Sequence, residues 1–555
     1  MKRVTPWKSV MRKRYLLLVL VSATALATAI YIYLNVNLSK MVAWSLLIRA
    51  DRYFLVSTNQ QQLPALRHLT VPWRRWNGLI DYDLVTSAAQ TKLIFPNFKA
   101  IYAKGDILRM KIVALDRRGR RKRYGGDFFR AKLVSKDSVN ASTAGKITDH
   151  GDGTYTVQFV LAWAGTVQVH TQLVHPSEAV EVIKQIRDTI PNRRVFFCHF
   201  QDQRTERPGE WTPCTGQRNT SLPRKMLCDF SKKSVNATWH CERPKHYPCS
   251  AIHVCKFDYN RTKRLVESLI SGDEKRLFSR LLLKRDMRRS TLIRVVDRGI
   301  ESEVLPRCGP CLAQTPSEGY WYNRLWYSLS CRARHFLQTG DVLQCLRNKT
   351  VFMQGDSTMR QWYFRLVDRI SAQSEEITKS QEFIGPFAAI DNASNIRLHF
   401  RFHGEPIQKK INISFRNIHY VADELDQLAG GPDVVVILGL WAHFVAEPLV
   451  AFRARLYAIS HAIKRLIHRS PYTKVIIRTS NTRRHDKLFI SVQSSDWLAQ
   501  ELNVVIRDIF GRHESVAILD VWEMTLCQEY PDDAHPNVHV VDSELSLLLS
   551  YICPS

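Results

Sequence analysis

The chain has 555 residues, of which 45% are hydrophobic and 24% are charged, and its formal net charge is +29. This length allows two or three domains, and the composition is that of a globular protein, which excludes a disordered chain. The positive charge favours acidic partners, such as sialylated or sulfated glycans, anionic membranes or nucleic acid.

The first predicted element is an apolar run, residues 15–34, that contains no charged residue. Residues 1–14 hold six basic residues and no acidic one, which places this basic tail in the cytosol. Twenty apolar residues span a bilayer. The run therefore predicts a signal-anchor, a single membrane span with the body in the lumen. The alternative is a cleaved signal peptide, because Ala25 and Ala27 start Ala-x-Ala patterns.

Two further features predict a lumenal body. All twelve cysteines lie beyond the apolar run, and their even number is typical of disulfides formed in an oxidising compartment. The sequons for N-glycosylation that lie well beyond the run begin at Asn140, Asn219, Asn236, Asn260, Asn348, Asn392 and Asn412. We therefore expect a protein of the secretory pathway, either a Golgi membrane protein with a lumenal body or a secreted one, and no nucleic-acid partner.

Residues 35–90 show no sustained period and are predicted to form a stalk. Residues 91–190 contain short strand-like segments at 107–115, 154–159 and 166–171, with glycine-containing turns beside them. Short alternating strands joined by tight turns predict a β-sandwich.

Residues 191–310 are predicted to be a connector. Six cysteines fall within 198–255, which indicates a segment stapled by disulfides, and 260–300 has the pattern of a basic amphipathic helix. Cys308 and Cys311 have the spacing of a redox pair, but nothing nearby predicts the fold that such a pair needs. We expect structural disulfides there. No metal site is predicted, because no second Cys/His pair has zinc-finger spacing.

Residues 311–555 have an α/β pattern. The predicted strands cover 351–354, 396–404, 433–439, 474–479 and 516–521. Helical patterns, such as 447–468, lie between them. Strands that alternate with helices predict a doubly wound sheet, whose ligands lie at the carboxyl ends of the strands.

The first of these strands ends at Gly355-Asp356-Ser357, and a helical pattern follows. This places the Ser357 hydroxyl at the carboxyl edge of the sheet and at a helix N-terminus, where free N–H groups favour negative charge. That position suits a nucleophile whose reaction creates an oxyanion. The alternative is an N-cap serine in an ordinary turn.

A proline-rich loop follows the last predicted strand and contains Asp532 and His535. In this loop the carboxylate could orient the imidazole, and the imidazole could deprotonate Ser357. Asp533 and His539 are competing candidates, and the Asp-x-x-His spacing favours the first pair. The alternative is that these histidines are ordinary surface residues.

The order of these motifs resembles that of the SGNH/GDSL hydrolases. Their residues are more similar still to the PC-esterase branch found in the neurexophilin and PC-esterase domain (NXPE) family. The matching segments are Gly319-Tyr320-Trp321, Leu329-Ser330-Cys331, Gly355-Asp356-Ser357-Thr358, Arg360-Gln361-Trp362, His443-Phe444, His535-Pro536, His539-Val540 and Tyr551-Ile552-Cys553. The resemblance covers most of the chain after about the first forty residues. It implies an immunoglobulin-like β-sandwich at 91–190, similar to neurexophilins, and an SGNH-like domain at 311–555.

The resemblance also implies roles for individual residues. Ser357 is the expected nucleophile, His535 the general base and Asp532 the carboxylate that orients it. The N–H groups of Ser357 and Gly404 are candidate oxyanion donors, because a glycine lets a ligand approach the backbone.

The chain departs from the superfamily pattern after its third predicted strand. Many SGNH enzymes have Gly-x-Asn there, with the asparagine as an oxyanion donor, whereas this chain has Gly439-Leu440-Trp441-Ala442-His443-Phe444. His443 and Asn481 are the candidates for the missing donor. Losing one donor typically lowers the rate by roughly 10²–10³.

The resemblance implies a serine-dependent O-acetylesterase or O-acetyltransferase that acts on hydroxyls of cell-surface glycans, such as those of sialic acids. No bound cofactor is expected, and a transferase would use an acyl donor such as acetyl-CoA. The alternative is a neurexophilin-like binding glycoprotein, whose β-sandwich meets a cell-surface receptor and whose esterase-like domain is weak or inactive. The missing Gly-x-Asn favours this alternative, while the serine and the Asp-x-x-His motif oppose it.

Overall fold

The part of the chain that the computed structural model describes begins at Ile80. It comprises residues 80–137, 140–202, 207–219, 221–279, 287, 291–299, 304–376, 383–407, 412–485, 487–531 and 533–554. The predicted tail, membrane segment and most of the stalk lie outside these residues. Within them, no helix has both the length and the apolar character that a membrane crossing requires.

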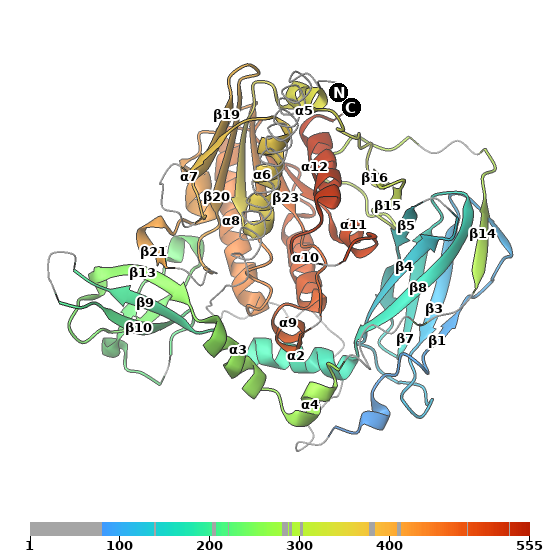
Figure 1. The fold of residues 1–555 in the computed structure, drawn as a ribbon, viewed down its shortest axis with the longest axis horizontal. Helices are drawn as coiled ribbons and strands as arrows, with labels where there is room; N and C mark the ends of the chain where they lie inside the picture. The colour runs from blue at the N-terminus through green and yellow to red at the C-terminus, as the bar shows by residue number, and fades with distance from the viewer. Residues whose placement is uncertain are drawn as a thin grey trace, which may run out of the picture. The chain divides into compact units, whose positions relative to one another are not determined.

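Two β-sheets enclose one core in the N-terminal part (Figure 1). The first contains, in order, β1 (Lys92–Ile94), β3 (Ile107–Val113), β7 (Thr154–Val160) and β6 (Lys146–Asp149). The second contains β16 (Leu325–Ser328), β15 (Gly319–Tyr322), β5 (Ala141–Ala144), β4 (Phe128–Ser135), β8 (Gly165–His175), β14 (Leu292–Val296) and β2 (Ile101–Ala103). Alternate residues such as Ile112, Val157 and Leu133 point into the shared core and are fully buried. The strands predicted at 107–115, 154–159 and 166–171 are present as β3, β7 and β8.

The prediction of one basic amphipathic helix over 260–300 is wrong. The described residues form α3 (Tyr259–Ser268), the short α4 (Gly272–Arg276) and then strand β14. In β14, Ile293 and Val295 are buried, whereas Leu292 and Arg294 are exposed, which is the two-residue period of a strand. The many arginines in residues 260–300 fit the polar face of a helix, so the short alternation of β14 could not be recognised in the sequence.

The hairpin of β15 and β16 lies in the stretch that the sequence groups with the C-terminal domain, yet it extends the second sheet of the N-terminal part. Tyr320 pairs with Thr143 of β5. The Trp321 indole also donates a 2.8 Å hydrogen bond to the carbonyl of Met524 in α11 (Trp522–Leu526). This hairpin therefore contacts both the N-terminal β-sandwich, through β5, and the C-terminal α/β domain, through α11.

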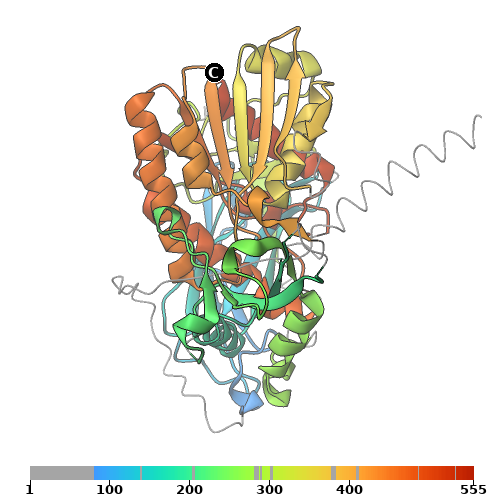
Figure 2. The same cartoon turned by 90° about the vertical axis from the view of Figure 1, so that its left-hand side faces the viewer.

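The cysteine-rich connector forms a third sheet, drawn in green at the front of Figure 2. Its strands, in order, are β11 (Leu227–Asp229), β12 (His240–Glu242), β10 (Glu210–Thr215), β9 (Phe196–Phe200), β13 (Ile252–Phe257) and β21 (Ile413–Ser414). Three disulfides staple it, namely Cys198–Cys255, Cys214–Cys241 and Cys228–Cys249. The predicted stapled segment is confirmed.

Two further disulfides lie in the C-terminal part, Cys308–Cys331 and Cys345–Cys553. Cys308 is thus paired with a distant cysteine and not with Cys311, which is an exposed free thiol. The expected structural role of Cys308 is confirmed, but the expectation of disulfides for the whole even set fails, because Cys527 is also a free thiol and is buried.

A seven-stranded sheet forms the centre of the C-terminal part (Figure 1). Its order is β18 (Ser374–Glu376), β19 (Phe387–Asp391), β20 (Ile396–Phe402), β17 (Thr350–Gly355), β22 (Val434–Gly439), β23 (Lys474–Arg478) and β24 (Val516–Leu519). The last five are parallel, and they correspond to the five predicted strands.

Helices cover both faces of this sheet. Val436 and Leu438 of β22 pack in one core with α8 (Leu449–Arg469) and α10 (Asp496–Phe510). Val435 and Ile437 pack in another core with α6 (Ser357–Arg369) and α12 (Val538–Ile552). Because the side chains of β22 are buried on both faces of the sheet, this strand is a continuous apolar run.

The other α-helices of the described residues are α2 (Ser177–Thr189), α5 (Thr339–Leu346), α7 (Val421–Gln427) and α9 (Leu488–Gln493).

The Cys345–Cys553 disulfide closes a loop of 208 residues and ties the end of α12 to α5. Because a cross-link over a long loop restricts the unfolded chain strongly, the double change Cys345→Ala and Cys553→Ala should lower the free energy of unfolding by about 2–5 kcal/mol. Urea unfolding measures this difference. Cys311→Ser is the matched control and should leave the unfolding midpoint unchanged; equal stability of the two variants would contradict the expectation.

Candidate functional site

Ser357 lies where a strand turns sharply into a helix. Strand β17 ends at Gly355, Asp356 is the N-cap, and α6 begins at Ser357. A Cβ on Gly355 would lie only 2.3 Å from the carbonyl oxygen of Gly439, so a glycine is needed where the ends of β17 and β22 approach. Ser357 is 6% exposed. The serine is therefore held at the carboxyl edge of the parallel sheet, beside the helix N-terminus.

The loop before α12 brings His535 to this serine. His535 Nε2 and Ser357 Oγ are 2.9 Å apart, although the two residues are 178 positions apart in the chain. The Gln361 side chain of α6 donates a 2.9 Å hydrogen bond to the Pro536 carbonyl, which holds the loop beside the helix. The structure thus brings together two of the three residues expected in the triad.

The third predicted residue, Asp532, lies outside the described residues, and its role stays a prediction. Its competitor Asp533 accepts a long hydrogen bond, 3.4 Å, from the backbone N–H of His535. The other competitor, His539, stacks on Tyr530 with ring centroids 5.7 Å apart. His539 lies in the first turn of α12, and His535, in the loop before this helix, is the histidine beside Ser357.

The Asp356 carboxylate fixes the serine turn to the loop that follows β22. Oδ1 accepts hydrogen bonds from the N–H and hydroxyl of Thr358 at 2.8 and 2.7 Å. Oδ2 accepts from the N–H groups of Trp441 and Ala442 at 3.2 and 2.7 Å. Asp356 is completely buried. This aspartate is a functional residue with no role predicted above, and its place in the Gly-Asp-Ser motif is the signal that could have identified it.

A buried ion pair connects the serine turn with the histidine loop. Arg478 Nη2 lies 3.1 Å from Glu544 Oε1, and neither side chain is exposed. Arg478 also donates to the Thr358 hydroxyl at 3.2 Å and to Asn481 Oδ1 at 3.0 Å. Burial raises the pKa of Glu544, against the opposing effects of Arg478 and of the hydrogen bond from Trp362. Arg478 and Glu544 carry no motif and could not be predicted from the sequence.

Asn481, one of the predicted oxyanion candidates, supports the histidine loop. Its amide donates to the carbonyls of Thr482 and Ala534 at 3.0 and 3.2 Å, the second being the residue before His535. Both amide hydrogens are therefore engaged within the protein.

Gly404, another oxyanion candidate, follows β20 with φ +83°. A Cβ there would lie 2.3 Å from the His419 carbonyl oxygen, so the turn requires glycine. The N–H of the preceding His403 donates to the Gly355 carbonyl at 3.2 Å, which places this turn beside the serine strand.

His443, the third candidate, is buried and pairs with His403. The distance between His403 Nε2 and His443 Nδ1 is 2.9 Å. Burial and the neighbouring His443 lower the pKa of His403 well below its ordinary value, so His403 is neutral.

Most of the predicted glycosylation sites are exposed in the structure. Six of the seven asparagines are exposed, namely Asn140, Asn236, Asn260, Asn348, Asn392 and Asn412, and Asn219 is half-buried.

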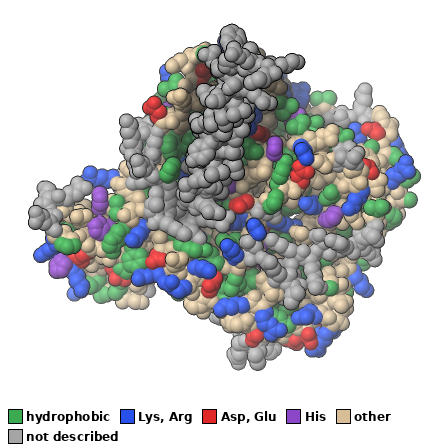
Figure 3. All heavy atoms as spheres, in the orientation of Figure 1, with side chains coloured by type: hydrophobic (Ala, Val, Ile, Leu, Met, Phe, Trp, Pro, Cys, Tyr) green, Lys and Arg blue, Asp and Glu red, His purple; other side chains and the backbone are tan. Residues whose placement is uncertain are grey.

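The positive charge is spread over the surface. On the face drawn in Figure 3, lysine and arginine side chains occur over several parts of the molecule, with acidic side chains among them. The exposed Arg118, Arg121 and Lys104 are each paired with an aspartate. This distribution supports a general attraction for anions and defines no single basic patch on that face.

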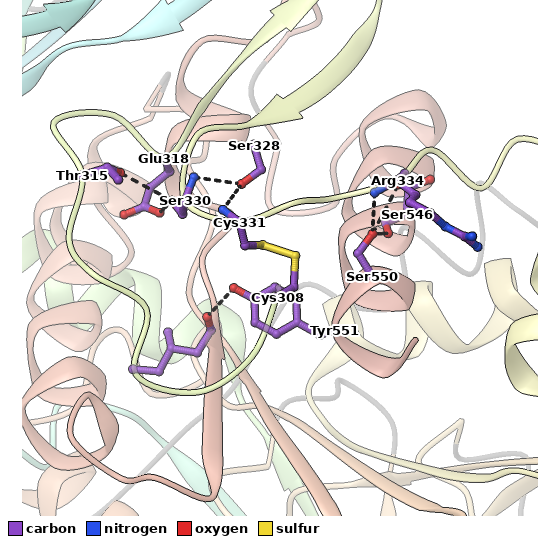
Figure 4. The surroundings of a disulfide bond; sticks show 11 residues. Cys308, Thr315, Glu318, Ser328, Ser330, Cys331, Arg334, Ser546, Ser550 and Tyr551 are labelled. Atoms are coloured by element: carbon purple, nitrogen blue, oxygen red, sulfur yellow. Dashed lines mark hydrogen bonds between the residues drawn. A yellow bond between two sulfur atoms is a disulfide. The ribbon is translucent and has the colours of Figure 1, made fainter. Parts of the chain in front are cut away.

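Two cavities, of about 430 and 710 Å³, lie away from Ser357. They share Glu318, Arg507 and Asp520 in their linings, and neither lining includes Ser357 or His535. Figure 4 shows Glu318 and Ser330, which line the larger cavity, near the Cys308–Cys331 disulfide. Because a nucleophile and a base must meet within hydrogen-bond reach, we place the candidate active site at Ser357 and not at the larger hollow.

Glu405, beside Gly404, is a buried carboxyl group whose Oε2 accepts a 2.9 Å hydrogen bond from the Tyr420 hydroxyl. Burial raises the pKa of Glu405 to about 8, against the opposing effects of Tyr420 and Arg455. The folded protein therefore keeps this carboxyl protonated at neutral pH.

In the unfolded chain Glu405 ionises above its ordinary pKa of 4.5, so unfolding releases a proton between about pH 4.5 and 8. The contribution of Glu405 to the free energy of unfolding should therefore fall as the pH rises through this range, by about 1.4 kcal/mol for each pKa unit. Glu405→Gln cannot ionise and should flatten this decline. Urea unfolding of both proteins at several pH values measures it, and parallel pH profiles would contradict it.

Comparison with known proteins gives two family matches. Residues 326–553 match the family described as "NXPE family member 4-like, C-terminal domain", and residues 82–273 match "Neurexophilin".

Among solved structures, the filamin domain of Lin-41 is 11% identical, with 16% of this chain and 80% of that chain covered and a TM-score of 0.14. Invasin, a bacterial integrin-binding protein, is 10% identical, with 60% of this chain and 59% of that chain covered and a TM-score of 0.13. Likenesses this weak carry no argument about fold or function.

Proposed function

The chain belongs to the NXPE family, and from this premise we propose that it is a secretory-pathway glycoprotein whose C-terminal domain transfers or hydrolyses O-acyl groups on glycans. The observation that carries the proposal is the 2.9 Å distance between Ser357 Oγ and His535 Nε2 at the carboxyl edge of a parallel sheet. The five disulfides and the neurexophilin match are consistent with the secretory pathway. We also propose that the C-terminal domain is of the SGNH type and that the N-terminal sandwich is immunoglobulin-like.

In the proposed mechanism, Ser357 Oγ attacks the acyl carbonyl carbon while its proton passes to His535 Nε2. The carbonyl oxygen becomes an oxyanion. The tetrahedral intermediate then collapses, and the leaving oxygen or sulfur takes the proton from His535, which leaves an acyl ester on Ser357. Water or a sugar hydroxyl next loses its proton to His535 and attacks this ester, and the proton returns to Ser357. The first acceptor gives an esterase and the second an acetyltransferase.

The surroundings of Ser357 support stabilisation of negative charge. Ser357 is the first residue of α6, whose thirteen residues direct their peptide dipoles toward this end. The N–H groups of Ser357 and Gly404 are the proposed backbone donors, and Asp532 is the proposed orienting carboxylate. The donors act on the oxyanion more strongly in a nearly buried site than they would in water.

The net charge of +29 supports an acidic glycan, such as a sialylated one, as the substrate. The proposal requires no bound cofactor. An acetyltransferase of this kind would take its acetyl group from a donor such as acetyl-CoA, and the same Ser357 would carry it.

A second candidate function is binding of a cell-surface receptor by the neurexophilin-like part. The match over residues 82–273 and the absence of Gly-x-Asn after β22 favour it. A saturable receptor interaction that is unchanged by Ser357→Ala would support this candidate.

The catalytic proposal is tested with the full chain purified from mammalian cells. One assay uses an O-acetylated sialyl oligosaccharide, and a second uses acetyl-CoA with the unacetylated oligosaccharide; mass spectrometry follows the acetyl group in both. We expect turnover in one assay, its loss in Ser357→Ala, and a fall of roughly 10²–10⁴ in His535→Ala. His539→Ala is the matched control and should keep wild-type activity. Activity that survives Ser357→Ala would overturn the proposal.

A further inference from the structure

We infer that His403 is a positioning residue that holds His443 in the tautomer with hydrogen on Nε2, so that His443 donates a hydrogen bond to the oxyanion formed at Ser357. This inference rests on the proposed function. It assigns the oxyanion donor that an asparagine supplies in many SGNH enzymes, and it adds a residue, His403, that has no motif of its own.

The two histidines lie on either side of the serine strand. In the sheet order, β20 and β22 are the two neighbours of β17. His403 directly follows β20, and His443 lies in the loop after β22, so their 2.9 Å hydrogen bond bridges the end of β17.

Hydrogen bonds of the backbone fix this bridge against the serine turn. The N–H of His403 donates to the carbonyl of Gly355, and the N–H of Ala442, the residue before His443, donates to the Asp356 carboxylate at 2.7 Å. Gly355 and Asp356 are the two residues before Ser357. The histidine pair is thus attached at both ends to the turn that presents the nucleophile.

The burial of His403 decides which nitrogen holds its hydrogen. His403 is completely buried, and its Nδ1 makes no hydrogen bond to any other described residue; its own backbone lies beside the ring. A neutral imidazole carries one N–H. Hydrogen on Nδ1 would bury an unsatisfied donor, which proteins rarely tolerate, whereas a bare acceptor is tolerated more often. The hydrogen therefore belongs on Nε2, where it is donated to His443 Nδ1.

This assignment determines the state of His443. Because its Nδ1 accepts the hydrogen bond from His403, the hydrogen of neutral His443 must be on Nε2. The loop after β22 thus presents a side-chain N–H, as an asparagine at this place would. With the opposite tautomer, His443 would present a lone pair and would repel an oxyanion.

The experiment measures how fast a fluorophosphonate probe labels Ser357 in the full chain, because phosphonylation also places negative charge on an oxygen in the oxyanion site. His443→Ala should slow labelling by roughly 10²–10³, and His403→Ala should slow it by about tenfold or more. His403→Gln, whose amide N–H can replace Nε2–H, should restore most of the rate. Thermal unfolding confirms that each variant is folded, and Tyr420→Phe is the control for a nearby loss of a buried hydrogen bond.

The decisive comparison uses His443→Asn. An amide N–H needs no partner to fix its tautomer, so in this background His403→Ala should change the labelling rate little. If His403→Ala slows labelling equally in both backgrounds, or not at all in the wild-type background, the inference is overturned. A folded wild-type chain that the probe does not label would overturn the proposed function, and the inference with it.

Discussion

The Asp356 carboxylate accepts four hydrogen bonds, and the geometry around Ser357 depends on them. Two come from Thr358 and shape the first turn of α6; the other two come from Trp441 and Ala442 and bring in the loop after β22. Burying a carboxylate completely destabilises the folded protein unless both of its oxygens accept hydrogen bonds. Here both oxygens are bound twice, so the buried charge specifies one arrangement of two segments that are distant in the sequence.

A second buried group extends this arrangement to the histidine. Arg478 binds Thr358 on the serine side and Asn481 on the histidine side, and Glu544 of α12 neutralises its charge. The Arg478 guanidinium also lies 4.8 Å from the centroid of the Trp362 ring. An arginine suits this position, because its planar group donates in several fixed directions at once. The ends of β17 and β23 and the middle of α12 are thereby held around one point, which is the condition for a preorganised site.

Local patterns in the sequence were sufficient for much of the fold. Strand β22 is a continuous apolar segment, and β3, β7 and β20 alternate apolar with polar residues, so each could be predicted from its own residues. Very short strands, and strand pairs between segments that are distant in the sequence, could not be predicted in this way. The strand β14 is five residues long and sits among arginines, and the hairpin of β15 and β16 pairs with β5, about 180 residues earlier. The pairing of Cys308 with Cys331 also depends on the fold and not on spacing.

The site also contains residues that local sequence patterns predict and residues that only long-range contacts bring together. Ser357 and His535 stand in motifs whose order predicts their meeting, while His403, Arg478 and Glu544 act only through contacts made by the folded chain. The residues that react stand in motifs, and of the residues that support them only those in or beside a motif or strand end, such as Asp356 and Asn481, carry a signal in the sequence. This is expected, because the supporting contacts are side-chain packing and hydrogen bonds between different strands.

The most direct test of the proposed mechanism is to determine whether Ser357 carries the acyl group. The full chain is mixed with an O-acetylated sialyl oligosaccharide or with acetyl-CoA and quenched in acid, and the acylated peptide is identified by mass spectrometry. The proposed mechanism predicts an acetyl ester on Ser357 that forms fast enough to support turnover. Turnover of the glycan with no acetyl group on Ser357, or with the acetyl group on another residue, would contradict it.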